Sequence, residues 1–304
     1  MAGGGIRLVS DPARVVTVPL DPEYVAARTV LLDALEALAD HRDALVVVGA
    51  QAVYLRTEPL EGYQPFTTDA DLTIDPGHLP PTPGLEDAMR RAGFHLKGEA
   101  SGRPEPGSWE AEVTIAGRPE PLVIPVDLIV PETVAPAGGR RGARLGGEHG
   151  KRAARRATGL EGSLVDRSIM PIRALKGGDA RRFEVNVAGK AALLVSKLHK
   201  IEDRSERPDR LTDKDGGDVL RLVLSSTPDE MVERSSVLLG DPRSADTTRR
   251  AIDLLDSLFG TPRGVGTQMA IRALTGVMEP ATVIEICTAF SRDALDRLRR
   301  AGLR

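Results

Sequence analysis

Three acidic residues in the first half of the chain have the spacing of a divalent-cation site. Asp69 and Asp71 stand two residues apart in a segment that alternates polar with apolar residues, which predicts a strand over 69–75. Residues i and i+2 of a strand point to the same face, so we expect the two carboxylates to lie side by side. Asp127 belongs to a second expected strand, over 122–130, and completes a set of three acids.

Such a set of acids suggests metal-dependent chemistry. Two carboxylates on one strand and a third from a neighbouring strand can hold a pair of divalent cations. Mg²⁺ is the expected ion, because it binds a few carboxylates together with substrate phosphates. An Asp-x-Asp pair that stood alone would also suit solvated acids on a surface strand, and that alternative stays open at this point.

A glycine precedes these acids at an expected turn between a strand and a helix. Residues 44–50 form a short apolar, β-branched run that predicts a buried strand, and 51–56 continue as a helical turn. Gly49 at this junction would let backbone N–H groups approach a phosphate closely.

The elements that must position these residues predict an α/β (α+β) protein with a small mixed sheet. A helix is expected over 21–40, because Asp21 is a good N-cap and Pro22 suits the first turn. A further helix is expected over 85–92, and further strands are expected over 112–116, 168–174 and 182–187.

The second part of the chain has helical periodicity throughout. Helices are expected over 188–204, 214–225, 228–239, 245–259, 267–276 and 281–300. At 304 residues the chain is long enough for about two domains. We therefore expect an α/β domain over residues 1–187 and a helical C-terminal domain over 188–304.

A basic segment interrupts the first domain. Residues 132–162 are rich in Gly and Arg without sustained periodicity, which predicts a mobile basic loop or linker. Its cations are candidate RNA-binding residues: Arg140, Arg141, Arg144, Lys151, Arg152, Arg155 and Arg156. A solvated charge run is the plainer interpretation. The net charge of −3 gives the whole molecule no general attraction for nucleic acid, so any such binding must be local.

Composition excludes several other classes of protein. The single cysteine, Cys287, rules out an internal disulfide framework and a Cys-rich zinc site. The five histidines lack metal-ligand spacing, and no serine lies in a G-x-S-x-G motif. No run is long and apolar enough to span a membrane, and the first 20 residues do not have the pattern of a secretion signal. We therefore expect a cytoplasmic protein without a membrane partner.

The order of the motifs resembles the nucleotidyltransferase superfamily that includes DNA polymerase β. More narrowly, it resembles the AbiEii-type toxin nucleotidyltransferases, including the MenT toxins. The similarity covers roughly residues 25–225, and three motifs carry it after the glycine turn: Thr67-Thr-Asp-Ala-Asp71, Ser196-Lys-Leu-His-Lys200 and Lys214-Asp-Gly-Gly-Asp-Val-Leu220.

The resemblance implies a role for each matching residue. Asp69, Asp71 and Asp127 would bind two Mg²⁺ ions, and Asp127 would help to activate an acceptor hydroxyl. Lys197 would neutralise charge on the leaving pyrophosphate, and Asp215 would pair with Lys197 or lie near the nucleotide. For Asp215 an acid favoured at a helix N-terminus is the plainer alternative. The remaining nucleotide-binding candidates are Gly49, Ala50, Thr68 and Lys200; Ala50 stands where many relatives have a second Gly or a Ser.

The resemblance also implies a reaction and its partners. The expected activity is Mg²⁺-dependent transfer of a nucleoside monophosphate from an NTP to a hydroxyl, with CTP or UTP favoured. The acceptor would be the 3′ end of tRNA, and the protein would be the toxin of a toxin–antitoxin pair with a cognate antitoxin protein. Two alternatives stay open: a small-molecule or protein acceptor, and a catalytically idle module that binds nucleotide or RNA.

Overall fold

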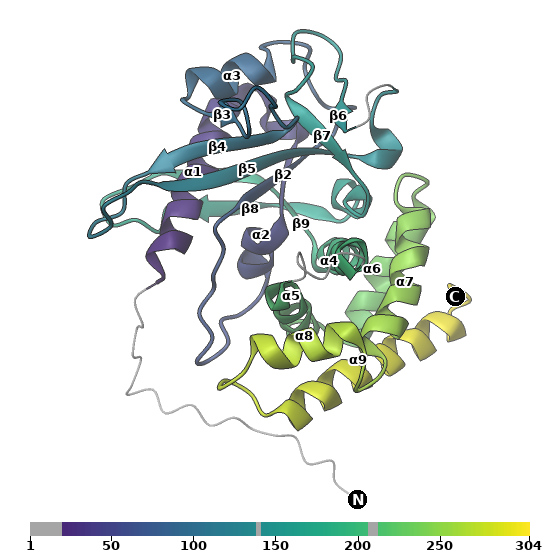
Figure 1. Cartoon of the computed structure of the whole chain (residues 1–304). Coiled ribbons are helices and arrows are strands. Elements are labelled where there is room, and N and C mark those ends of the chain that lie inside the picture. Colours follow the sequence, from purple (N-terminus) through teal and green to yellow (C-terminus); the bar gives the residue numbers. More distant parts are fainter. Residues whose placement is uncertain (1–19, 138–140, 206–211) are drawn as a thin grey trace, which may run out of the picture.

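The computed structural model describes residues 20–137, 141–205 and 212–304. It has a mixed α/β architecture, as the sequence predicts: one sheet of parallel and antiparallel strands, followed by a group of helices. Figure 1 shows the sheet in the upper part of the view and the helices of the second half below and to the right of it.

The sheet is built almost entirely from the first 188 residues. Its strand order is β3-β4-β5-β2-β1-β9-β8, and β7 pairs with both β5 and β6. The strands are β1 (Leu45–Val48), β2 (Ala70–Ile74), β3 (His95–Leu96), β4 (Ser108–Val113), β5 (Leu122–Pro131), β6 (Gly142–Ala143), β7 (Ala154–Ala157), β8 (Arg167–Arg173) and β9 (Arg182–Ala188).

The register of the central strands places the predicted acids at one level. Antiparallel pairing of β1 with β2 sets Val48 opposite Asp71, and parallel pairing of β2 with β5 sets Asp71 opposite Asp127. On the far side of β5, Ser108 of β4 pairs with Asp127. Four neighbouring strands therefore present the end of β1, two carboxylates and a hydroxyl in a single row.

Local sequence accounts for the two helices that flank β1. In α1 (Pro22–Ala37) the side chain of Asp21 accepts a hydrogen bond of 2.7 Å from the Glu23 N–H, which is the predicted N-cap. The helix ends three residues earlier than predicted, because the short 3₁₀ helix η1 (Ala39–Ala44) leads into β1. After β1, the chain turns at Gly49 directly into α2 (Gly49–Arg56).

The helices of the second half agree with the predicted ranges to within a few residues. They are α4 (Lys190–Ser205), α5 (Asp213–Leu224), α6 (Pro228–Gly240), α7 (Ala245–Phe259), α8 (Val265–Ala273) and α9 (Pro280–Arg300). The Thr227 side chain accepts from the Glu230 N–H, and Glu230 accepts in return from the Thr227 N–H, so α6 begins with a capping box. In the described part of the chain, none of these helices is long and apolar enough to cross a membrane.

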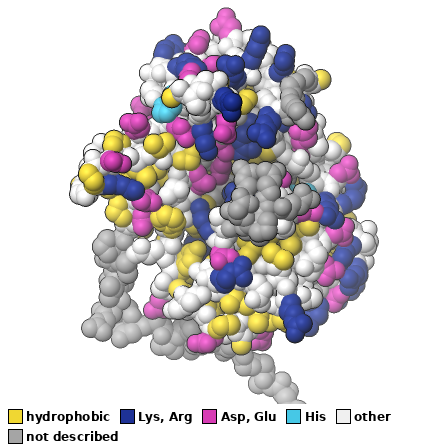
Figure 2. Space-filling view, in the orientation of Figure 1, with side chains coloured by type: hydrophobic (Ala, Val, Ile, Leu, Met, Phe, Trp, Pro, Cys, Tyr) yellow, Lys and Arg dark blue, Asp and Glu magenta, His cyan; other side chains and the backbone are white. Residues whose placement is uncertain are grey.

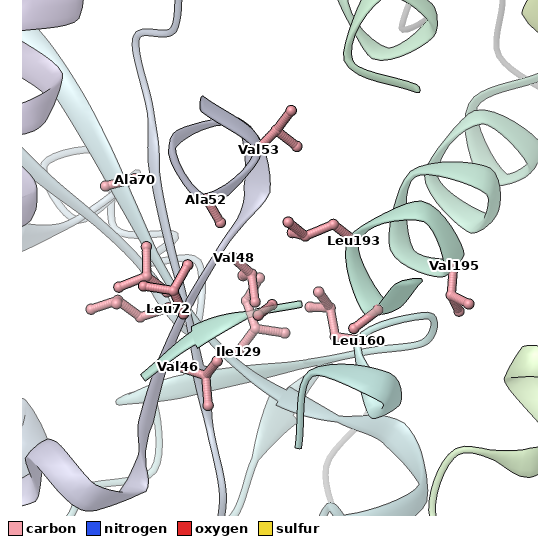
Figure 3. Packing of buried hydrophobic residues seen from close by; sticks show 14 of the residues in the cluster. Val46, Val48, Ala52, Val53, Ala70, Leu72, Ile129, Leu160, Leu193 and Val195 are labelled. Carbon is pink, nitrogen blue, oxygen red and sulfur yellow. The ribbon is translucent and has the colours of Figure 1, made fainter. Parts of the chain in front are cut away.

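One continuous hydrophobic cluster joins the sheet to the helices. Val46, Val48 and Leu72 of the sheet belong to the same buried cluster as Leu193 of α4 and Leu220 of α5. Figure 3 shows Leu193 directed from α4 toward the side chains of β1 and α2. This packing holds α4 and α5 beside the strands that carry the acids.

Two predicted segments differ from the structure. The strand expected over 112–116 lies earlier, as β4, because Ser108 and Trp109 pair with Asp127 and Val126 of β5. The expected mobile loop over 132–162 contains the short 3₁₀ helix η2 (Glu132–Val134), β6, β7 and the start of a second 3₁₀ helix, η3 (Glu161–Leu164). Because β7 adds to the sheet beside β5, the described part of this segment is anchored structure and not a linker.

The remaining described helix is α3 (Leu85–Arg91), which matches the expected helix over 85–92. α3 packs against α1, and α1 in turn packs against strands β2, β4 and β5 of the sheet.

Candidate active site

The glycine turn and the acids meet directly. Gly49 has a φ of +69°, and a Cβ atom added there would overlap the carboxylate of Asp71. Only glycine satisfies both the left-handed backbone conformation and this close approach. The first turn of α2 therefore lies against Asp71, as a site built around β1 and β2 requires.

Asp127 is held by two side chains that the sequence analysis did not connect with it. The Ser108 hydroxyl donates to Oδ1 over 2.6 Å, and Nη2 of Arg155 donates to Oδ2 over 2.8 Å. Ser108 comes from β4 and Arg155 from β7, two of the strands that pair with β5. Arg155 was predicted to contact RNA; here it neutralises an acid of the site.

Asp69 contacts the helical half of the molecule. Its carboxylate accepts from the Thr67 hydroxyl, and the Thr67 oxygen in turn accepts from Nζ of Lys214 over 2.7 Å. Nζ of Lys214 also lies 3.8 Å from Oδ1 of Asp69. Lys214 is the second residue of α5. This helix therefore brings a cation to the edge of the set formed by Asp69, Asp71 and Asp127, which we call the acidic row.

The electrostatic balance differs between Asp69, just before β2, and Asp71 within it. Burial, followed by the neighbouring charge of Asp69, raises the pKa of Asp71 to about 6. Burial also pushes the pKa of Asp69 upward, but Lys214, Lys200 and the Thr67 hydrogen bond outweigh it, so this pKa is lowered. Asp71 is therefore the acid whose ionised form most needs a further positive charge.

Lys197 occupies a different position from the one expected of a phosphate-binding side chain. It is 2% exposed, and its Nζ donates to Asp215 over 2.8 Å and to Asp218 over 2.6 Å. Burial alone would lower the pKa of Lys197, but the two carboxylates raise it well above the usual value. The expected pairing with Asp215 is present, and it joins α4 to α5 inside the protein.

Two lysines of the helical half, Lys200 and Lys214, remain partly open to solvent beside the acids. Their side chains are 32% and 27% exposed. Nζ of Lys200 lies 3.6 Å from Asp215, and its charge acts on both Asp69 and Asp71. Burial lowers the pKa of Lys214 despite the attraction of Asp69. These two lysines supply the positive charge that faces the acidic row from the helical half.

The donor set is chemically suited to Mg²⁺. Asp69, Asp71 and Asp127 offer carboxylate oxygens, the ligands that this ion prefers. The raised pKa of Asp71, which stems partly from Asp69 and Asp127, marks a concentration of negative charge that a divalent cation would relieve. Across the described residues no three or more acids, histidines or cysteines are arranged around a common metal position, and Asp127 is engaged by Arg155. The donor chemistry of these residues fits the ion, whereas their arrangement in this structure does not surround one metal position.

A basic surface lies next to the acidic row, and we define it by four cations: Arg141, Arg144, Lys151 and Arg152. All four side chains are exposed and make no ion pair with other described residues. Arg156 pairs with Glu132, and Arg140 lies outside the described residues. Figure 2 shows Lys and Arg side chains gathered over the upper part of this face, where Figure 1 places α3, β6 and β7.

The sequence analysis selected some neighbours of the site residues and missed others. It named Thr68, whereas Thr67 links Asp69 to Lys214. The Thr-Thr-Asp motif itself does not distinguish the two hydroxyls, since only the fold decides which one faces α5. Ala50 is buried in the first turn of α2, so it has only its backbone N–H to offer a phosphate.

Comparison with protein-family models gives no match, and no curated protein matches the chain. The geometry of the site is therefore the basis for a functional proposal.

Proposed function

We propose that the chain is a Mg²⁺-dependent nucleotidyltransferase of the AbiEii and MenT type, which transfers a nucleoside monophosphate from an NTP to an acceptor hydroxyl. The observation that carries this proposal is the contact between Gly49 and Asp71, with Asp127 in register beside Asp71 and Asp69 two residues before it. A glycine turn packed on a row of acids suits a triphosphate that is bound through metal ions.

The three acids share one task in this reaction, and their neighbours Ser108 and Arg155 support it. Asp69, Asp71 and Asp127 would hold Mg²⁺, which supplies charge neutralisation at the phosphates and lowers the barrier to attack by the acceptor hydroxyl. Ser108 keeps the Asp127 carboxylate oriented through its 2.6 Å hydrogen bond. Arg155, once it leaves Asp127, remains beside the site as a cation for a phosphate oxygen.

Lys214 and Lys200 replace Lys197 as the phosphate-binding cations. Both are partly exposed and act electrostatically on Asp69, whereas Lys197 is enclosed between two carboxylates. An ammonium group close to the acids stabilises the charge that develops on the leaving pyrophosphate. Lys197 acts one step away: it holds Asp215 and α5 in place, and thereby positions Lys214.

The acceptor we propose is the 3′ end of a tRNA, with CTP or UTP as the donor. The four unpaired cations of the basic surface favour a polyanionic acceptor over a small molecule, because each can contact a backbone phosphate. The tRNA end, the pyrimidine donor and the toxin role with a cognate antitoxin protein follow from the resemblance to the toxin family.

The decisive experiment incubates the purified chain with Mg²⁺, total tRNA and each α-³²P-labelled NTP in turn, and resolves the products on a denaturing gel. We expect label on tRNA from one pyrimidine nucleotide, and none with Asp71→Asn. Asp246→Asn is the matched control, because that acid is 94% exposed on α7, and it should label tRNA normally. Absence of label in the wild type, with Mg²⁺-dependent NTP binding retained, would favour another acceptor or a binding module.

A further inference from the structure

An exposed aromatic side chain stands close in the chain to the acids of the candidate active site. The chain has nine aromatic residues, all within the described ranges, and Phe66 is the one whose side chain is exposed, at 42%. It precedes Thr67 and stands three residues before Asp69. Three residues span at most about 11 Å, so the backbone of Phe66 lies within one nucleotide's reach of the acids.

The segment around Phe66 is held by two hydrogen bonds. The Tyr54 hydroxyl of α2 donates to the Phe66 carbonyl over 2.9 Å, and Lys214 of α5 donates to the Thr67 hydroxyl over 2.7 Å. The Tyr54 ring is in turn held by the Arg221 guanidinium, 5.1 Å from its centroid. An apolar ring is thus exposed to solvent on a well-anchored segment. This exposure is unfavourable, because an apolar side chain gains free energy when it is removed from water.

The groups around Phe66 leave one part of a nucleotide, its base, without a binding partner. Lys214, Lys200 and the acids suit phosphates and metal ions, and none of them recognises the flat apolar face of a base. A phenyl ring does so, because every nucleobase offers a π-face for stacking. A nucleotide whose phosphates lie at the acids is long enough to bring its base to Phe66.

We propose that Phe66 stacks on a nucleobase of the substrate and fixes it relative to Asp69 and Asp71. This inference rests on the proposed function. The base belongs to the donor NTP or to the terminal nucleotide of the acceptor RNA, and the stacking chemistry is the same for both. Phe66 is a binding residue here, and the phosphate contacts do not depend on it.

The test uses Phe66→Trp, Phe66→Ala and Phe66→Tyr in the full chain. Trp109, the single native tryptophan, is fully buried, so a tryptophan at position 66 gives a distinct fluorescence signal. We expect CTP or UTP with Mg²⁺, or a short single-stranded RNA, to quench that signal, and inorganic triphosphate to leave it unchanged. Quenching by the NTP alone assigns the donor base, and quenching by the RNA alone assigns the acceptor base.

Calorimetry on the other variants provides the second readout. Phe66→Ala should weaken binding of the base-containing ligand by about tenfold and leave inorganic triphosphate binding unchanged, while Phe66→Tyr retains the affinity. Val265→Ala, at another exposed apolar side chain (44%) on α8, should change neither affinity. Wild-type affinity of Phe66→Ala for both the NTP and the RNA overturns the inference and leaves the proposed function intact. If the wild type binds neither NTP nor inorganic triphosphate, the proposed function fails and the inference with it.

Discussion

The Arg155 guanidinium lies 2.8 Å from Asp127, the register partner of Asp71, and so a cation of the protein itself neutralises one of the three acids. The two side chains are 32% and 24% exposed, which leaves this ion pair accessible to solvent. If Mg²⁺ binds to Asp127, it competes with Arg155 for the same carboxylate.

Replacing Arg155 with glutamine should therefore increase the affinity for a divalent cation. A partly exposed ion pair contributes up to about 1 kcal/mol, so we expect Mn²⁺ to bind about threefold to fivefold more tightly. Electron paramagnetic resonance of free Mn²⁺ measures this directly. Arg156→Gln is the control, since its partner Glu132 lies outside the acidic row and its Mn²⁺ affinity should not change. Equal affinities in the two variants would place the ion away from Asp127.

Asp71→Asn should stabilise the fold while it abolishes nucleotide transfer. The pKa of Asp71 in the folded protein, about 6, is above its ordinary value of 3.8, so the folded state binds the proton more tightly than the unfolded state. The contribution of Asp71 to the free energy of unfolding consequently falls as pH rises from about 4 to about 6, by at most about 3 kcal/mol. Asp71→Asn does not lose this free energy, because asparagine does not ionise.

Urea unfolding of both proteins across that pH range checks the sign. Above about pH 6 without metal, Asp71→Asn should be the more stable protein, and Mg²⁺ should stabilise the wild type more than the variant. A stability difference between the two proteins that stays constant over this interval would contradict the raised pKa of Asp71.

The sequence predicts the periodic parts of the fold and not the contacts between distant strands. The helices α4 to α9 and the strands β2 and β5 are visible as repeating apolar positions. By contrast, β7 is a four-residue strand in which Arg155 and Arg156 follow small residues, so it has no strand-like hydrophobic pattern. Asp127, the partner of Arg155, stands 28 residues earlier in the chain. Only the pairing of β5 with β7 brings the two side chains together.

The burial of Lys197 likewise could not be predicted from local sequence. Helical spacing shows that Lys197 and Lys200 share one side of α4, but it does not show which of them points into the protein. The answer depends on Asp215 and Asp218, which lie 18 and 21 residues further along the chain and enclose Lys197 when α5 packs beside α4. Asp127, Asp69 and Gly49, each placed by a local strand pattern, are the site residues that sequence reasoning located best.

Lys197→Met should destabilise the protein strongly. It leaves the buried carboxylates of Asp215 and Asp218 without their shared cation, a loss of about 3–5 kcal/mol for a broken buried pair. Arg204→Gln removes a partly exposed partner of the same Asp215 and should cost about 1 kcal/mol or less. Urea denaturation at neutral pH measures both changes. A small effect of Lys197→Met on stability, combined with lost NTP binding, would restore a direct phosphate contact for Lys197.

Lys214→Met should reduce transfer without much loss of stability. Its side chain is partly exposed, and its hydrogen bond goes to the Thr67 hydroxyl at the edge of the acids. Removal of a cation that stabilises the leaving pyrophosphate typically lowers kcat by about a hundredfold. Lys176→Met, at an exposed lysine after β8, is the matched control and should leave kcat unchanged. An unaltered kcat in Lys214→Met would exclude this role.

The basic surface is best tested by charge removal, because deletion of the segment would remove β7 from the sheet and Arg155 from Asp127. We expect a variant with glutamine at Arg141, Arg144, Lys151 and Arg152 to bind tRNA more weakly at low salt. If all four cations contact phosphates, the slope of log K against log salt concentration should fall by about 3. Filter binding over a salt series gives the slope, and NTP affinity, measured alongside, should stay constant because none of the four contacts the acidic row. An unchanged slope would mean that these cations are a solvated surface and that the acceptor binds elsewhere.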